Sequence, residues 1–245
     1  MKTISKIMLA AVLIAGSSAA TLASNPYHTA INKTVQTTED RHLSGFNAVS
    51  VSGSWDIYIT QGSTESVKVE APSDVIGKIV TEVDGGTLKI HSKNENWSWN
   101  WGNKKIIIYV TAKSLNSITM SGSGDIFFKN GIKGDKLALR VSGSGDITGR
   151  VNVNELESSI SGSGDIKVSG TAKTSAVKVV GSGDFTGGDL VTQSTMVKVA
   201  GSGDARVNAS QKVDASVVGS GDIFYTGGAT NVSSSSAGSG DIHKF

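Results

Sequence analysis

The stretch Ser-Gly-Ser-Gly-Asp-Ile at residues 121–126 decides the fold, because the chain repeats it at a nearly fixed interval. It recurs unchanged at residues 142–147 and 161–166, and shorter Gly-Ser-Gly-Asp forms follow in four further copies. Successive motif aspartates are 18 to 21 residues apart. A fixed period of this size is typical of stacked structural units. The aspartates of the seven copies are Asp125, Asp146, Asp165, Asp184, Asp204, Asp222 and Asp241.

Alignment of the copies predicts which side chains face the core. Apolar residues recur two and four positions before the first motif glycine, and again directly after the aspartate. These positions share one parity, so their side chains point to the same side of an extended chain. Thr119, Arg140 and Lys178 lie between them and predict a solvent-facing side. By the same parity, both motif glycines point inward, while the serines and the aspartate point outward.

The repeat predicts an all-β protein. No helical period competes within residues 115–245, so coils of about 19 residues are expected to stack as a parallel β-solenoid, with strands about 4.8 Å apart. Ser234 and Ser236 replace core residues in the last copy, which predicts a polar terminal coil. Residues 43–114 should add strands and one hairpin, with its turn at Asp84-Gly85-Gly86. We therefore expect residues 43–245 to form one solenoid domain, with clear repeats over 115–245.

The N-terminus predicts export. Residues 1–23 combine Lys2 and Lys6, a short apolar core, and small residues that place cleavage after Ala20 or Ala23. Residues 24–42 are polar and are expected to form a flexible leader. No later stretch is apolar enough to span a membrane as a helix, so we expect a location in the periplasm, on the outer-membrane surface or outside the cell. The chain has 23 basic and 21 acidic residues, so removal of two leader lysines leaves 21 of each and favours no nucleic-acid partner.

The outward aspartates pose an electrostatic problem. Carboxylates stacked about 5 Å apart repel each other by roughly 0.8 kcal/mol in water. Full solvation, hydrogen bonds from serines and turn N–H groups, or bound cations would relieve this repulsion. A calcium ladder along the seven aspartates is the metal alternative, since glycine- and aspartate-rich rolls bind Ca²⁺ between turns. One aspartate per coil departs from that pattern, so we expect a structural turn without a metal or other cofactor.

The sequence predicts no catalytic residues. The absence of cysteine excludes disulfides, thiolate metal sites and a cysteine nucleophile. The four histidines lack metal-ligand spacing, and the glycine-rich turns match neither a dinucleotide loop, a phosphate loop nor a nucleophile elbow. Polysaccharide lyases also use β-helices, but with long loops over a groove, whereas these coils are short. We expect a non-enzymatic protein, with a polysaccharide-active enzyme as the weaker alternative.

Trp97, Trp99 and Trp101 form the most distinctive feature outside the repeat. In a strand the three rings would share one face and would be candidates for binding a surface glycan or a protein. The alternative is a hairpin end that folds over an open end of the solenoid and covers its core.

An ordered series of segments across about residues 43–245 matches the pattern of a known family. The segments are Phe46-Asn-Ala-Val-Ser-Val-Ser-Gly-Ser, Asp56-Ile-Tyr-Ile-Thr-Gln-Gly, the Val67/Val69 strand, Asp84-Gly-Gly-Thr-Leu-Lys-Ile, and Tyr109-Val-Thr-Ala-Lys-Ser-Leu before the motif. In this series the chain resembles the putative auto-transporter adhesin, head GIN domain family (DUF2807). The resemblance implies an exported, right-handed β-helix-like domain with an adhesive role, without catalytic residues to transfer. Trp55 departs from the small residue usual at its position.

These observations together predict a binding or adhesion module of the bacterial cell envelope. A rigid ladder would present repeated serine and aspartate groups, with the tryptophans as an anchor. A structural envelope protein that self-associates through the ends of its stack is the second hypothesis, and it would make the protein an oligomer.

Overall fold

The computed structural model describes residues 35–93 and 104–245, in which nearly every element is a strand. The elements are β1 (Gln36–Asp40), β2 (Ala48–Gly53), β3 (Asp56–Gln61), β4 (Ser66–Pro72), the short 3₁₀ helix η1 (Ile76–Lys78), β5 (Ile79–Asp84), β6 (Thr87–Ser92), β7 (Ile107–Ala112), β8 (Ser117–Gly122), β9 (Ile126–Gly143), β10 (Ile147–Gly162), β11 (Ile166–Gly181), β12 (Phe185–Gly201), β13 (Ala205–Gly219), β14 (Ile223–Thr226), β15 (Asn231–Gly238) and β16 (Ile242–Lys244).

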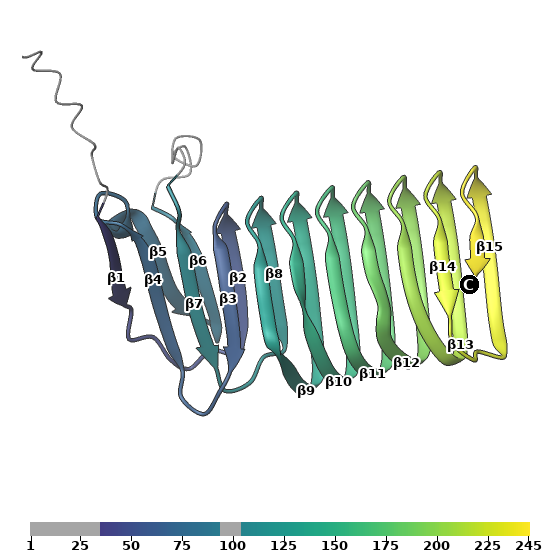
Figure 1. The fold of residues 1–245 in the computed structure, drawn as a ribbon, viewed down its shortest axis with the longest axis horizontal. Helices are drawn as coiled ribbons and strands as arrows, with labels where there is room; N and C mark the ends of the chain where they lie inside the picture. The colour runs from purple at the N-terminus through teal and green to yellow at the C-terminus, as the bar shows by residue number, and fades with distance from the viewer. Residues whose placement is uncertain (1–34, 94–103) are drawn as a thin grey trace, which may run out of the picture. The chain divides into compact units, whose positions relative to one another are not determined.

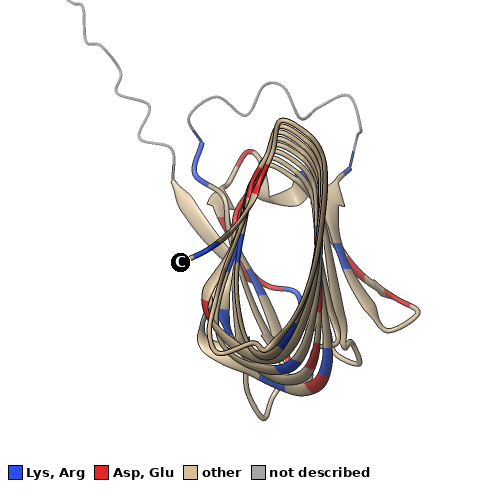
Figure 2. Cartoon of the chain, turned by 90° about the vertical axis from the view of Figure 1, so that its right-hand side faces the viewer, with Lys and Arg blue, Asp and Glu red and all other residues tan. Residues whose placement is uncertain are grey.

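Successive coils pair in parallel, with equivalent residues opposite each other except at irregularities in the middle of some coils. Strands β9 to β13 each follow most of one coil, and Ile147–Gly162 lies opposite Ile166–Gly181 with equivalent residues paired. Figure 1 shows these coils side by side, and they superimpose in the end-on view of Figure 2. Residues 34–245 form one compact unit. The predicted all-β parallel solenoid is confirmed.

The coils form two walls around a core. The first wall begins with the strand order β1-β4-β7-β3. It continues with the first half of each strand from β9 to β13 and ends with β14 and β16. The second wall begins with the strand order β5-β6-β2-β8. It continues with the second half of each strand from β9 to β13 and ends with β15. Each motif copy turns the chain from the second wall of one coil into the first wall of the next.

The predicted inward columns form part of this core. The residue directly after each motif aspartate is buried in the first six coils, as are the residues two and four positions before the first motif glycine. In the last coil Ser234 and Ser236 occupy the corresponding positions and are exposed, as the prediction of a polar terminal coil requires. The buried column residues are Ile118, Met120, Ile126, Leu139, Val141, Ile147, Ser158, Ile160, Ile166, Val177, Val179, Phe185, Val197, Val199, Ala205, Ala215, Val217 and Ile223.

Antiparallel strands complete the N-terminal end. The predicted hairpin is confirmed, since β5 pairs with β6 on either side of the turn at Gly85 and Gly86. On the first wall, β4 pairs antiparallel with β7, and β1 pairs antiparallel with β4. Trp55 is buried within this end of the core. Among the described residues, no helix is long and apolar enough to cross a membrane.

Strand β1 corrects one prediction. Residues 24–42 were expected to form a flexible leader, but Gln36–Asp40 pairs along its full length with β4. The sequence Gln-Thr-Thr-Glu-Asp lacks apolar alternation, and its side chains are exposed or half-buried, so backbone pairing with the free edge of β4 is what orders it. The predicted signal peptide at 1–23 and residues 24–34 lie outside the described residues.

Candidate functional site

Each copy of the motif forms a tight corner that only glycine fits. The first glycine of every copy has φ between +122° and +130°, a region that residues with a Cβ rarely adopt. The second glycine is buried, and a Cβ on Gly164 would overlap the carbonyl oxygen of Gly145 in the preceding coil. Both glycines are therefore required by the close approach of successive backbones.

The corners are hydrogen-bonded to one another through the backbone. The N–H groups of Ser144 and Gly145 both donate to the carbonyl oxygen of Gly122, at 2.9 and 3.0 Å. The same pair of bonds recurs at each later corner. The serine between the two glycines points outward and is exposed in all seven copies, as predicted.

The motif aspartates form a continuous ladder. The backbone N–H of Asp165 donates to Oδ1 of Asp146 at 2.8 Å, and the same bond joins each later aspartate to the one before it, at 2.7 or 2.8 Å. At the start of the ladder the Asp146 N–H lies 3.3 Å from Oδ1 of Asp125. Of the three ways to relieve repulsion, donation from turn N–H groups therefore occurs here. An ionised acceptor makes such bonds stronger than neutral ones.

The ladder gives these carboxylates an architectural role. One oxygen of each aspartate from Asp125 to Asp222 is engaged by the next coil. Within the described part of the chain, no three His, Asp or Glu side chains gather as a metal-binding cluster would require. These hydrogen bonds join successive coils along the aspartate column.

The predicted partner-binding residues Trp97, Trp99 and Trp101 lie outside the described residues. The strands that precede and follow them, β6 and β7, pair with β2 and β3, respectively.

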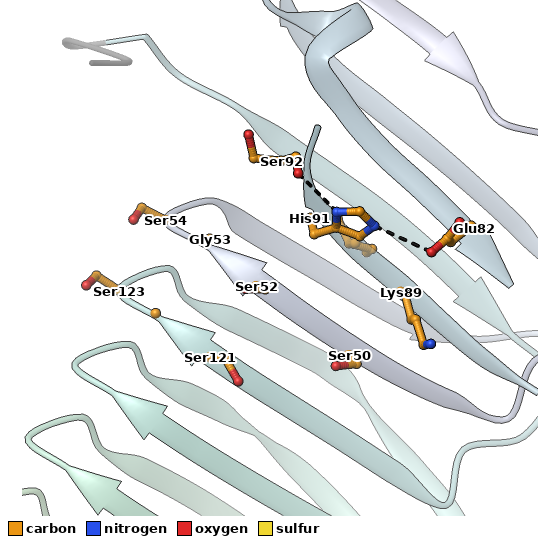
Figure 3. Close-up of a pocket in the computed structure, with 12 residues that line it drawn as sticks. Ser50, Ser52, Gly53, Ser54, Glu82, Lys89, His91, Ser92, Ser121 and Ser123 are labelled. Carbon is orange, nitrogen blue, oxygen red and sulfur yellow. Dashed lines mark hydrogen bonds and ion pairs between the residues drawn. The ribbon is translucent and has the colours of Figure 1, made fainter. Parts of the chain in front are cut away.

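A groove of about 980 Å³ opens on the second wall near its N-terminal end, and Figure 3 shows its lining. Strands β2 and β8 supply outward-facing serines from alternate positions, because the residues between them, such as Val49 and Val51, point into the core. The hairpin β5–β6 supplies the charged side. The serines that line the groove are Ser50, Ser52, Ser54, Ser92, Ser121 and Ser123.

Three charged or titratable side chains border these hydroxyl groups. His91 Nε2 lies 3.5 Å from Glu82 Oε1, and its Nδ1 lies 3.0 Å from the carbonyl oxygen of Ser92 (Figure 3). Lys89 donates a hydrogen bond to Asp84, which raises the pKa of the Lys89 amine and lowers the pKa of the Asp84 carboxyl. The groove therefore offers hydroxyl donors and acceptors beside one carboxylate and one imidazole, an arrangement suited to a hydroxyl-rich ligand.

Sequence reasoning missed this groove because its residues come from distant segments. His91 pairs with Ser52 across β6 and β2, and Ser52 pairs with Ser121 across β2 and β8. The signal in the sequence is the alternation of serine with valine at Ser50 and Ser52, which marks an outward polar row without showing what lies beside it.

Sequence reasoning also missed an aromatic ladder on the first wall. The ring of Tyr58 stacks on those of Tyr109 and Phe127, with centroid separations of 5.7 and 5.3 Å. Because the ring faces cover one another, the ladder stabilises neighbouring coils and leaves little face for a sugar to stack on. Desolvation, with Glu70 close by, raises the pKa of Tyr109, whose hydroxyl donates to Glu70 Oε2 at 3.3 Å. The signal in the sequence is an aromatic residue directly after an inward-facing isoleucine, which occurs at Tyr58, Tyr109 and Phe127.

Comparison with known families agrees with this architecture. The family model for the putative auto-transporter adhesin, head GIN domain matches residues 45–229. The chain belongs to this family. The resemblance inferred from the sequence is thereby confirmed, and the match spans both the N-terminal strands and most of the repeats.

Solved structures of related proteins share the fold. A putative adhesin from Bacteroides fragilis NCTC 9343 is 27% identical, with 86% of this chain and 97% of that chain covered and a TM-score of 0.81. A putative lipid binding protein from Parabacteroides distasonis ATCC 8503 is 27% identical, with coverage of 86% and 96% and a TM-score of 0.67. A putative adhesin from the same organism is 24% identical, with coverage of 87% and 98% and a TM-score of 0.68. No protein with a curated description matches the chain.

Proposed function

We propose that this head GIN family member is an exported, non-enzymatic binding module of the bacterial cell envelope, and that its serine-lined groove holds a surface glycan. The observation that carries the proposal is the convergence of six serines on one groove beside His91 and Glu82. Sugar hydroxyls both donate and accept hydrogen bonds, as serine hydroxyls do, so the two surfaces are chemically complementary.

The scaffold supports this role. The groove lies on strands that are hydrogen-bonded on both sides within the sheet, so its side chains start from a fixed backbone. Little ordering entropy is then lost when a ligand binds. Membership of an adhesin head family, and likeness to a putative adhesin of B. fragilis, point to attachment at the cell surface.

The groove favours binding over catalysis. Glycoside hydrolysis generally requires two carboxyl groups on either side of the scissile bond. Among the described residues that line the groove, Glu82 is the single carboxylate, and it is paired with His91. The tryptophan run lies between β6 and β7 in the sequence, and we propose Trp97, Trp99 and Trp101 as an additional anchor for the same ligand.

The experiment is glycan-array and whole-cell binding by the mature chain. A groove variant with Ser50→Ala, Ser52→Ala and Ser121→Ala removes three hydroxyls from exposed or half-buried positions and should lose most binding. A matched variant with Ser159→Ala, Ser161→Ala and Ser163→Ala changes β10 and the corner that follows it, which the coil of β9 separates from the groove, and should bind as the wild type does. A triple Trp→Ala variant tests the anchor. Absence of binding to any glycan or cell, or equal binding by both serine variants, would sink the proposal.

A further inference from the structure

The outer face of the second wall changes character along the stack. The position directly before the first motif glycine is serine at Ser142 and Ser161, and it becomes apolar in the following coils. The sheet register places each of these apolar residues opposite the equivalent residue of the next coil, and all of them are exposed. Val180 is 39% exposed and Val218 is 56% exposed. The later members of this column are Val180, Ala200, Val218 and Ala237.

A second apolar row and two lysines complete the surface. Lys178 lies in register with Lys198, and Ala176 lies in register with Met196, which is 46% exposed. We call this surface the apolar–basic patch. It consists of Ala176, Lys178, Val180, Met196, Lys198, Ala200 and Val218.

The two lysines lack the charge partners that other coils provide. On the preceding coils Arg140 pairs with Glu157 at 3.4 Å, and Lys136 pairs with Glu155 at 3.1 Å. Neither Lys178 nor Lys198 forms an ion pair with any residue in the described ranges. Asp214 lies opposite Met196 on the next coil, but no ion pair joins it to either lysine within the described residues. Like charges directly opposite on a sheet are destabilising, so an anionic partner would relieve this pair.

We propose that the apolar–basic patch rests on an anionic lipid surface. The lysine amines would contact lipid phosphates, while Val180, Met196 and Val218 would enter the boundary between headgroups and acyl chains. This combination of exposed apolar side chains with cations is what peripheral membrane surfaces use. A second copy fits poorly, because isologous packing of this patch would bring four lysines together. A soluble polyanion would engage the lysines and leave the apolar rows in water.

The proposal is independent of the glycan proposal, because the patch and the groove are separated by the coils of β9 and β10. Both open on the second wall. A chain lying with this wall on a membrane would therefore turn its groove toward glycans carried on the same surface.

The test is co-sedimentation of the mature chain with vesicles of phosphatidylglycerol and phosphatidylethanolamine, and with vesicles of phosphatidylcholine alone. Binding is expected to the anionic vesicles and to weaken as salt is raised. The variant Lys178→Gln/Lys198→Gln should bind them about 25-fold more weakly, or about fivefold per lysine. The variant Val180→Ser/Val218→Ser, which installs the residue found at Ser142 and Ser161, should also bind several-fold more weakly.

The matched control is Lys167→Gln, which removes an exposed lysine from the first wall and should leave binding unchanged. Failure to bind anionic vesicles, or equal binding to neutral ones, would overturn the proposal. A loss confined to the lysine variant, with wild-type binding by the valine variant, would show charge attraction alone, without insertion of the apolar side chains, and would overturn it as well. Glycan binding measured on the same variants keeps this result separate from the function of the groove.

Discussion

Removal of one side chain from the aspartate ladder tests whether the motif is architecture. Asp184 lies in the middle of the ladder, where its Oδ1 accepts the N–H of Asp204 at 2.8 Å and its own N–H donates to Asp165. Asp184→Ala deletes the acceptor and leaves the Asp204 N–H without its partner. Asp184→Asn keeps an acceptor oxygen in the same place and removes only the charge.

The two changes should have different costs. A half-buried donor left without a partner costs about 1–3 kcal/mol, so Asp184→Ala should destabilise the coil by that amount. Asp184→Asn loses about 1 kcal/mol of charge assistance. It also relieves repulsion from two neighbouring carboxylates, each contributing about 0.8 kcal/mol at 5 Å in water. The asparagine variant should therefore lie within about 1 kcal/mol of the wild type.

Amide hydrogen exchange at residue 204 measures the cost of losing this hydrogen bond directly. Repeat arrays open locally, so a single global free energy of unfolding is poorly defined for them. Asp184→Ala should reduce protection of that amide by roughly tenfold or more, while Asp184→Asn should retain it. Asp189→Ala and Asp189→Asn, at an exposed aspartate of β12, the strand that follows Asp184, serve as controls and should match each other. Equal protection in both Asp184 variants would refute the ladder as a stabilising element.

Three further changes test other parts of the structure. Gly183→Ala should destabilise the protein by about 3 kcal/mol or more, because its Cβ would overlap a backbone carbonyl of the preceding coil, whereas Gly188→Ala meets open space and should change the melting temperature little. Ser158→Val should raise the stability measured by thermal unfolding by about 1–2 kcal/mol, because the Ser158 hydroxyl is 1% exposed and has no hydrogen-bond partner among the described residues. The raised pKa of Tyr109 means that its neutral form is favoured in the folded state, so its contribution to stability is complete below the unfolded pKa of about 10 and is lost as pH rises through the folded value. Glu70→Gln should lower the Tyr109 pKa in an ultraviolet titration read against Tyr109→Phe, and an unchanged pKa would contradict the assigned contribution of Glu70.

The period and parity of the repeat were sufficient to predict the solenoid and its core. Inward residues such as Met120 and Ile147 recur at the same offsets from the motif, and stacking like on like is the arrangement that buries all of them. Strand β1 could not be predicted in this way, because its order comes from a backbone edge rather than from apolar side chains. The direction of the motif aspartates followed from parity, but their hydrogen-bond partners did not.

The groove was beyond sequence reasoning for a different reason. Its residues share a surface only because β6 pairs with β2 and β2 pairs with β8, which requires the order of strands in the wall. That order departs from the order of the strands along the chain. The coil of β2 and β3 is inserted between two later coils, one formed by β6 and β7 and the other beginning at β8. The repeat pattern fixes the later coils and says little about this insertion.

The most direct test separates the scaffold from the binding surface. A glycan identified on the array is titrated against two variants, and its affinity for each is measured. The groove variant is Ser50→Ala/Ser52→Ala/Ser121→Ala, and the corner variant is Ser163→Ala/Ser182→Ala/Ser202→Ala. The account predicts that the groove variant loses affinity while the corner variant binds as the wild type does, with unchanged melting temperatures for both. Loss of affinity in the corner variant, with full binding by the groove variant, would contradict it.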